Sequence, residues 1–343
     1  MRKLLAVFLI MTMMASLFGC TGKESGADEA EEPLSIEVYA MDTYMTLSAY
    51  GENAEKALAE SKAEIERIDK LFSTGDEKSE ISLLNKTKKA EVSEETCELI
   101  SRAKTIGKDV GGVFDISVYP VMRAWGFTDK NYRVPDKGEL EKLLEHVNAD
   151  NVECDEEKHE VSFKYEKVEI DLGGIAKGYT SDRVIDIMKE NGVEHALINL
   201  GGNVKVLGHK PDGSEWRVAI YDPENDENYI GGVEVHDKAV ITSGGYQRYF
   251  EENGKRYFHI IDLNDGFPAE NGLISATIIS DDGTLADALS TSLFIMGPEK
   301  AAEYWRKNKD QFDAVLVKAD GTVMVTEGIE KSYFSDGEFE VIK

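Results

Sequence analysis

Apolar and polar positions along the chain recur at regular spacings that change from segment to segment. Residues 34–50 alternate between the two kinds, which predicts one or two half-exposed strands. Residues 53–72 carry apolar side chains at helical spacing, and Asn53 stands where it can cap that helix. Ser93 opens a second predicted helix that runs to about Val110, where two glycines end it.

The rest of the chain continues this mixture. The remaining predicted elements are a short helix over 137–147, two strands within 151–172, a helix over 177–190, mainly strands from 195 to 280, a helix over 284–296, another from Pro298, and a hairpin with strands at 314–317 and 322–325. Strict strand–helix–strand alternation is absent from this order. The pattern therefore predicts an α+β fold, a single domain of largely antiparallel sheets with packed helices.

The first twenty residues differ from the rest. Arg2 and Lys3 precede an almost uncharged apolar run from Leu4 to Leu17, which is typical of a secretory signal and too short for a transmembrane helix. The ending at Gly19 and Cys20 resembles a bacterial lipobox, in which the cysteine is lipidated and becomes the mature N-terminus. Phe18 departs from that pattern, since a small residue is usual there, and plain secretion is the alternative.

These features predict the organisation of the chain. We expect residues 1–19 to be a lipoprotein signal peptide and residues 20–33 to be the lipidated Cys20 with an acidic linker, because this segment is charged and lacks apolar periodicity. Residues 34–343 are then the folded domain. The expected location is the extracytoplasmic face of the cell membrane, with the membrane reached through the lipid anchor at Cys20.

Charge narrows the range of partners. Of the 343 residues, 66 are acidic and 39 basic, giving a net charge of −27, and 41% are hydrophobic, which is enough for a sizeable core. Loss of residues 1–19, with their two basic residues, would take the charge to −29. Non-specific binding of nucleic acid depends on Lys and Arg neutralising phosphates, so no nucleic acid partner is expected. Anionic lipid surfaces should also repel the chain.

Cysteines and short motifs exclude several chemistries. Besides Cys20 there are Cys97 and Cys154, which we expect to be buried free thiols with no role as nucleophile or metal ligand. A zinc site is not supported, because the sequence contains neither C-x-x-C nor H-x-x-x-H. The G-x-S-x-G turn of serine hydrolases is also absent.

The segment from Glu169 to Gly178 has the composition of an anion site. A predicted strand ends at Asp171, two glycines follow, and a helix begins near Lys177. Glycines let a ligand approach the backbone, and helix N-termini offer N–H donors to anions. The alternative is an ordinary strand-to-helix turn.

The segment from Leu285 to Ser292 places polar groups within an apolar helix. Asp287 and Thr291 are four residues apart and share a helix face, with Ser290 beside them. A carboxylate and a hydroxyl on a core-facing stripe need a partner, and a hard cation such as Mg²⁺ fits these oxygen ligands. A buried Asp–Thr hydrogen bond is the alternative.

Two further segments combine small, aromatic and titratable residues. His259 lies in a strand-like apolar run after the glycine-containing stretch 241–246; it is structural if alone, and a candidate base if a Mg²⁺ site lies near it. The stretch 112–120 joins an Asp to aromatics, with Trp125 and Phe127 downstream. These aromatics could stack on a planar ring of a ligand, and core packing is the simpler interpretation.

Eight segments taken together resemble the ApbE family of FAD:protein FMN transferases, many of which are bacterial lipoproteins. The resemblance covers roughly residues 35–335. The segments, in family order, are Met41–Thr43, Ser79–Ser82 with Asn85, Gly112–Asp115, Asp171–Gly178, Ile198–Gly202, Thr242–Gly244, His259–Asp262 and Ala286–Thr291.

The resemblance implies an activity and a set of site residues. FAD would be cleaved at its pyrophosphate with the help of Mg²⁺, FMN would pass to a Thr or Ser hydroxyl of a target protein as a phosphoester, and AMP would leave. It implies His259 as base and Asp287 as catalytic, with Ser290 a weaker member of the metal shell. The implied metal ligands are Gly174, through its carbonyl, Asp287 and Thr291. The implied FAD contacts are Met41, Val113, Phe114, Asp115, Asp171, Lys177 and Ile261.

The chain departs from the family pattern at three places. Gly75 stands where the family often has an aromatic residue, so FAD is expected to bind less tightly. Asn203 replaces a usual Asp, and the turn 263–266 replaces a proline-containing one; both changes are expected to be tolerated. The alternatives to transfer are an FAD pyrophosphatase that releases FMN and AMP, and a non-enzymatic flavin-binding lipoprotein. The chain shows no acceptor motif of its own, so its partners besides FAD are expected to be extracytoplasmic acceptor proteins.

Overall fold

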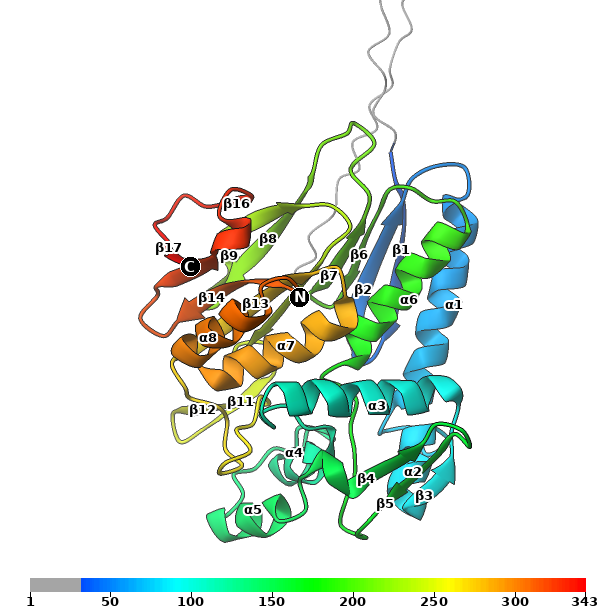
Figure 1. Ribbon diagram of the computed structural model, residues 1–343, viewed down its shortest axis with the longest axis vertical. Helices are drawn as coiled ribbons and strands as arrows, with labels where there is room; N and C mark the ends of the chain where they lie inside the picture. Colours follow the sequence, from blue (N-terminus) through cyan, green and yellow to red (C-terminus); the bar gives the residue numbers. More distant parts are fainter. Residues whose placement is uncertain (1–31) are drawn as a thin grey trace, which may run out of the picture. The chain divides into compact units, whose positions relative to one another are not determined.

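A nine-stranded sheet forms the centre of the fold (Figure 1). The computed structural model describes residues 32–343, so the predicted signal peptide, Cys20 and most of the linker lie outside the described residues. Among the described strands of this sheet, neighbours are antiparallel except β15 and β17. The strand order is β1 (Leu34–Ala40), β2 (Thr43–Ala49), β6 (Ala196–Leu200), β7 (Asn203–Leu207), β10 (Ala239–Gly244), β13 (Leu273–Ser280), β14 (Asp313–Lys318), β15 (Val323–Thr326) and β17 (Glu340–Ile342).

Each face of this sheet is covered by a different layer. Helices α1 (Ala54–Phe72), α6 (Ala176–Glu190), α7 (Gly283–Met296) and α8 (Pro298–Asn308) lie on one face (Figure 1). On the other face lies a three-stranded sheet of β16 (Tyr333–Phe334), β9 (Asn225–Val235) and β8 (Trp216–Asp222). Valines of both sheets fill the space between them, among them Val206, Val218, Val233, Val240 and Val315. The predicted α+β class with largely antiparallel sheets is confirmed.

Helix α7 is the innermost helix of the fold. Its residues are apolar or small on nearly every side, and most of them are buried, which is typical of a helix surrounded by protein. Its N-terminus needs partners for its free N–H groups. The Asp182 carboxylate of α6 accepts hydrogen bonds from the N–H groups of Gly283 and Thr284, and Asp282 accepts one from Leu285. The two bonds to Asp182 fix α7 against α6, and the bond to Asp282 caps α7 itself.

A second group of elements lies at one end of the large sheet (Figure 1). They are α2 (Glu80–Thr87), α3 (Glu94–Asp109), α4 (Tyr119–Trp125), α5 (Lys137–Leu144), a three-stranded sheet of β3 (Lys89–Glu91), β5 (Glu160–Phe163) and β4 (Val152–Asp155), and the hairpin of β11 (Tyr249–Glu252) and β12 (Lys255–Phe258). Trp125 and Phe127 are fully buried there against Phe250 and Tyr257. The core-packing interpretation of these two aromatics is therefore confirmed.

The predicted strand that ends at Asp171 is wrong. Residues 164–172 belong to no strand, and the chain there is held by a side chain instead. The Asn85 amide donates to the carbonyl of Ile170 at 2.8 Å and accepts from the N–H of Ile170 at 2.7 Å. The Asn85 side chain thus takes the place of a neighbouring strand, which apolar periodicity alone does not reveal.

The expectation of free thiols is also wrong. Cys97 of α3 and Cys154 of β4 form a disulfide across 57 residues of sequence, with their Cα atoms 6.4 Å apart. Two isolated cysteines carry no spacing signal, and α3 must pack on β4 before the pair can meet.

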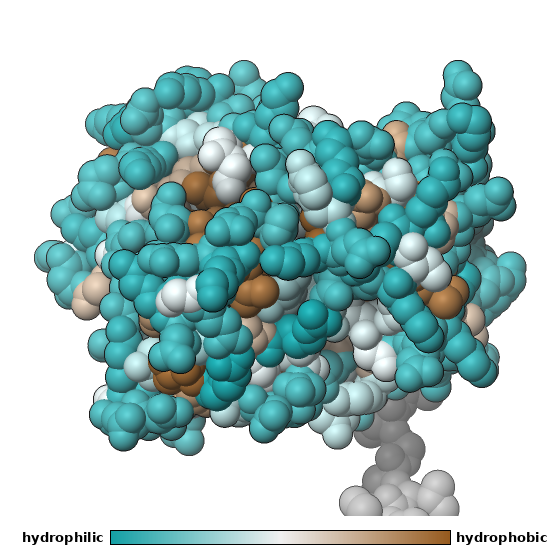
Figure 2. Space-filling view, turned by 90° about the horizontal axis from the view of Figure 1, so that it is seen from below, coloured by the Kyte–Doolittle hydropathy of each residue, from teal (hydrophilic) through white to brown (hydrophobic). Residues whose placement is uncertain are grey.

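The described part of the chain contains no helix that is long and apolar enough to span a membrane. The face seen in Figure 2 is mostly hydrophilic, with apolar side chains visible only in small separate patches. This agrees with a chain in which 31% of the residues are charged.

Candidate active site

A cavity of about 790 Å³ opens where the large sheet meets this second group of elements. Eleven residues predicted for the site come from five separate segments of the sequence, and all eleven line this cavity. They are Met41, Val113, Phe114, Asp115, Asp171, Gly174, Lys177, His259, Ile261, Asp287 and Thr291. The structure therefore brings together residues up to 250 positions apart. Their individual roles stay predictions.

Met41 reaches the cavity because of a tight turn. It and Asp42 form the two-residue connection of the β1–β2 hairpin, with φ angles of 50° and 59°. Positive φ at both positions is the signature of a type I′ turn, whose twist matches that of the strands. The Thr180 hydroxyl of α6 lies 3.9 Å from the sulfur of Met41.

The Phe114–Asp115 segment shapes another wall. Gly174 lies directly under the Phe114 ring, and a Cβ at Gly174 would come within 3.0 Å of it. The Asp115 carboxylate accepts from the N–H of Ser117 at 2.7 Å and from the N–H of Ala149 at 2.7 Å. Asp115 lines the cavity and also connects its own turn, through Ser117, to the loop that contains Ala149.

Asp287 is placed by close packing of two helices. Gly178 of α6 faces α7 so closely that a Cβ there would lie 2.2 Å from the carbonyl oxygen of Gly283 and 2.6 Å from the Cβ of Asp287. This approach lets the N–H of Gly178 donate to Oδ2 of Asp287 at 2.8 Å. Oδ1 accepts from the Asn203 amide at 2.9 Å, and Lys177 Nζ lies 4.0 Å from it. Asp287 is only 5% exposed, so these contacts hold a nearly buried carboxylate in the lining of the cavity.

Thr291 and Ser290 join a network of hydroxyls. The Ser243 hydroxyl of β10 lies 3.2 Å from that of Thr291 and 2.8 Å from that of Ser290. In the described part of the chain, the side chains of Asp287 and Thr291 bond to other partners and not to each other. The buried Asp–Thr hydrogen bond, which was the alternative for this helix face, is therefore wrong. Ser290 does not line the cavity; it reaches the site through Ser243.

Two residues of the cavity lining, His259 and Asp171, have shifted pKa values. Burial, together with the charges of Arg248 and Lys177, lowers the pKa of His259 to about 3. Its Nδ1 lies 3.3 Å from the carbonyl oxygen of Arg248, so a hydrogen on Nδ1 leaves Nε2 as a free acceptor. Burial raises the pKa of Asp171, although the N–H of Gly173 donates to its carboxylate at 2.6 Å.

A scan against protein families gives one decisive result: residues 41–316 match the ApbE family model. The chain belongs to the ApbE family. Two of its relatives are named FAD:protein FMN transferase. The one from Klebsiella pneumoniae (strain 342) is 36% identical over 236 residues, 68% of this chain and 72% of the relative. The one from Escherichia coli (strain K12) is 29% identical over 313 residues, 87% and 89% of the two chains.

Solved ApbE structures have the same fold. The crystal structure of the ApbE protein from Thermotoga maritima superposes with a TM-score of 0.81 at 33% identity, covering 87% of this chain and 98% of that one. The apo form of the flavinyl transferase ApbE from Pseudomonas stutzeri gives 0.80 at 28% identity, with 91% and 100% covered.

Two cavity residues of this ApbE chain were missed or undervalued from the sequence. Arg248, in the loop between β10 and β11, lines the cavity and donates to the carbonyl of Phe127 at 2.9 Å. No motif or spacing singles it out. Asn203 was noted only as a departure from the family, yet it is 3% exposed and bonds to Asp287 directly. Its position beside two glycines was the available signal.

Proposed function

We propose that this chain is an FAD:protein FMN transferase that acts in the cavity described above. The hydroxyl oxygen of a Thr or Ser on the acceptor protein forms a bond to the phosphorus of the FMN half of FAD. The P–O bond of the pyrophosphate breaks, AMP leaves with the bridging oxygen, and the hydroxyl proton passes to a base. The observation that carries the proposal is that eleven family-matched residues line one cavity of about 790 Å³.

Lys177 and Arg248 provide the positive charge that a pyrophosphate requires. Both line the cavity of a chain whose net charge is −27. Transfer of a phosphoryl-type group depends mainly on positioning and on neutralising charge. The two cations would hold the pyrophosphate, while apolar residues such as Val113, Phe114 and Ile261 would contact the rest of FAD.

We also propose that Gly174, through its carbonyl, Asp287 and Thr291 hold Mg²⁺. All three donors are oxygens, the ligand type that Mg²⁺ prefers, and all three residues line the cavity. Each Asp287 oxygen accepts one hydrogen bond and so keeps a lone pair for a ligand. When bound, such an ion supplies positive charge to the phosphate oxygens and to the leaving group.

His259 is the proposed base. Its lowered pKa keeps the imidazole neutral at physiological pH, so that Nε2 is able to accept the hydroxyl proton. A group with a pKa of about 3 is a weak base in the free enzyme. A bound pyrophosphate would oppose the charges of Arg248 and Lys177, and this raises the pKa of His259 in the complex.

One assay separates transfer from the two alternatives. The protein is incubated with FAD, Mg²⁺ and an acceptor protein, with the same acceptor carrying Thr→Val at its modified position as control. Flavin fluorescence that stays on the acceptor in a denaturing gel supports transfer. Free FMN with an unlabelled acceptor would indicate a pyrophosphatase, and unchanged FAD would indicate binding alone.

We propose further that the enzyme is anchored through lipidated Cys20 on the extracytoplasmic side of the membrane, where its acceptor proteins also lie. The signal-like segment before Cys20 supports this location. The Cys97–Cys154 disulfide supports it too, because disulfides persist mainly in oxidising compartments. The Cys20→Ser variant should leave the membrane fraction if this is correct, and should stay there if the anchor is elsewhere.

A further inference from the structure

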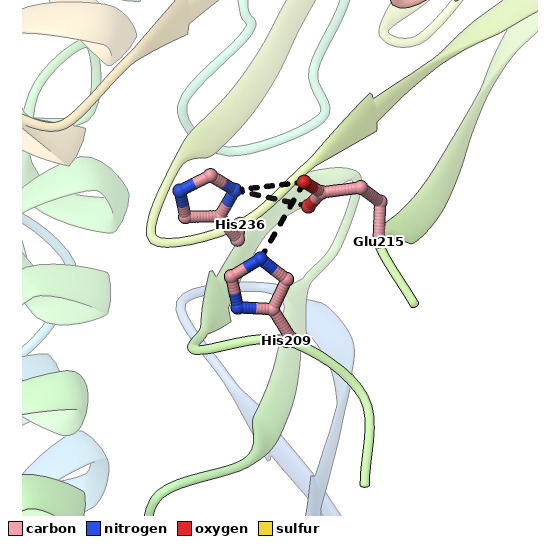
Figure 3. A group of neighbouring side chains, drawn as sticks. All are labelled: His209, Glu215 and His236. Carbon is pink, nitrogen blue, oxygen red and sulfur yellow. Dashed lines mark hydrogen bonds and ion pairs between the residues drawn. The ribbon is translucent and has the colours of Figure 1, made fainter. Parts of the chain in front are cut away.

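Two histidines and a glutamate gather on the surface, away from the cavity. His209, Glu215 and His236 (Figure 3) offer ligand atoms that all lie within 4.8 Å of one another. None of the three lines the cavity. Glu215 points toward both imidazole rings (Figure 3). Its carboxylate lies 3.5 Å from Nε2 of His209 and 3.0 Å from Nδ1 of His236.

We propose that this cluster binds one divalent transition-metal ion of the Zn²⁺ type. Two imidazole nitrogens and a carboxylate form a donor set that Zn²⁺ takes in proteins, at about 2.0–2.2 Å from each ligand. Ligand atoms at those distances on a tetrahedron are about 3.4 Å from one another. Two of the three separations, 3.0 and 3.5 Å, are close to that value, and the third lies within 4.8 Å, so side-chain rotations can bring all three donors onto one ion.

The backbone around the cluster is tightly fastened. Glu215 comes directly before β8 and His236 directly after β9, and their neighbours Trp216 and Val235 are paired across the two strands. His209 follows β7, and the loop before it is tied to the β9–β10 turn by a 2.8 Å bond from the N–H of Gly208 to Asp237. The three ligands are thus carried by the ends of three strands, which fixes their spacing.

The two imidazole rings lie directly beside each other. The imidazoles of His209 and His236 stack with centroids 4.3 Å apart and planes 17° from parallel. Because the lone pair of an imidazole nitrogen lies in the plane of its ring, one ring has to turn out of this stack before both nitrogens can bind one ion. The side chains expose 45%, 37% and 50% of their surface for His209, Glu215 and His236, which leaves an entry path and a fourth position for water.

This site would differ in chemistry from the proposed Mg²⁺ site. Mg²⁺ prefers oxygen ligands and keeps much of its water, whereas imidazole nitrogen suits Zn²⁺, Ni²⁺ and Cu²⁺. A bound ion would tie the β7–β8 loop to the β9–β10 turn and stabilise this end of the sheet pair. The inference does not depend on the proposed transferase activity.

The test is a titration of the purified protein with ZnCl₂. Excess Mg²⁺ is present throughout, so that it occupies the proposed Mg²⁺ site in the cavity and zinc is bound only elsewhere. Bound zinc is measured by elemental analysis after ultrafiltration, and the melting temperature is measured with and without ZnCl₂. The wild type should bind one Zn²⁺ per chain and melt at a higher temperature with zinc. His236→Asn and Glu215→Gln should each weaken binding at least about tenfold, since even outer partners of metal ligands matter that much.

The matched control is His159→Asn. His159 lies on the turn between β4 and β5 with a φ of 49°, a conformation that Asn tolerates, and it is not part of the cluster. This variant should bind zinc like the wild type. The proposal is overturned if the wild type binds no zinc, or if zinc binding and the melting shift survive in both cluster variants.

Discussion

The cavity and the His209–Glu215–His236 cluster both join residues that are distant in sequence, yet they are built differently. In the cavity, the donors of the proposed Mg²⁺ site are oxygens, and Asp287 is placed by two packed helices and is only 5% exposed. The cluster is shallow, and its donors are mostly nitrogens carried by the ends of strands. Glycines next to the cavity residues form motifs that can be recognised in the sequence, whereas no motif marks the strand ends that carry His209, Glu215 and His236. The difference shows why one site was predictable and the other was not.

Replacing Asp287 should separate the two sites most clearly. Asp287→Ala, and Asp287→Asn with its unchanged size, should abolish measurable FMN transfer, because the proposed Mg²⁺ site loses its only carboxylate. Zinc binding at the surface cluster should be unaffected. Transfer is measured by flavin fluorescence of the acceptor, and zinc by elemental analysis.

Asp281→Ala is the control for this change, since Asp281 lies near the same helix but is exposed and outside the cavity. It should transfer FMN at the wild-type rate. Mg²⁺-dependent transfer that persists in both Asp287 variants would remove Asp287 from the metal site.

Replacing His259 tests the base. His259→Ala should slow transfer by about 10²–10⁴ while FAD binding is kept, since general base catalysis contributes that much. Because the pKa of free His259 is lowered to about 3, it is already unprotonated at pH 5. The wild-type kcat/KM for FAD should therefore show no acid limb near pH 6.5 due to this residue. An unchanged rate in the variant would exclude His259 as base, and a limb near 6.5 that disappears with it would contradict the lowered pKa.

Replacing Gly178 tests the packing that places Asp287. In Gly178→Ala the new Cβ would overlap the carbonyl of Gly283, so α6 and α7 must move apart. We expect the free energy of unfolding to fall by about 1–3 kcal/mol, and transfer to fall as well. Both are measured on the same preparation, by denaturant melts and by the fluorescence assay.

Gly138→Ala is the matched control, because Gly138 lies in α5 with nothing within 4 Å of its added Cβ. There the free energy of unfolding should stay equal or rise by about 1 kcal/mol. Equal stability of the two variants would show that the helices are not as close as described.

Replacing Gly75 should have the smallest effect of these substitutions, and that effect concerns the affinity for FAD. Gly75→Tyr adds an aromatic ring beside Thr74, whose hydroxyl lies 3.4 Å from Asp171 of the cavity. Stacking on the flavin should tighten FAD binding by about 2–10-fold, which corresponds to about 0.5–1.5 kcal/mol. The dissociation constant is measured by quenching of flavin fluorescence.

Gly337→Tyr serves as control. Like Gly75, Gly337 donates its N–H to the hydroxyl of a serine two residues earlier, and a Cβ added to either glycine would lie 3.6 Å from that hydroxyl. Gly337 does not line the cavity. It should leave FAD affinity unchanged. Equal affinities in the two variants and the wild type would show that Gly75 does not border the flavin.

The sequence predicted what depends on local spacing. Apolar periodicity located helices such as α1 and α7, and the four-residue step from Asp287 to Thr291 placed both side chains on one face toward the cavity. Contacts made only after folding were not predictable. Asn85 replaces a strand partner at Ile170, Cys97 meets Cys154, and Arg248 enters the cavity from a loop. Each of these depends on how distant elements pack.

The mass of the intact acceptor protein, measured together with released AMP, tests the proposed transfer most directly. Wild-type enzyme with FAD and Mg²⁺ should raise the acceptor mass by that of FMN less one water and release one AMP for each acceptor modified. AMP released with free FMN and an acceptor of unchanged mass would contradict the assignment of this cavity to FMN transfer.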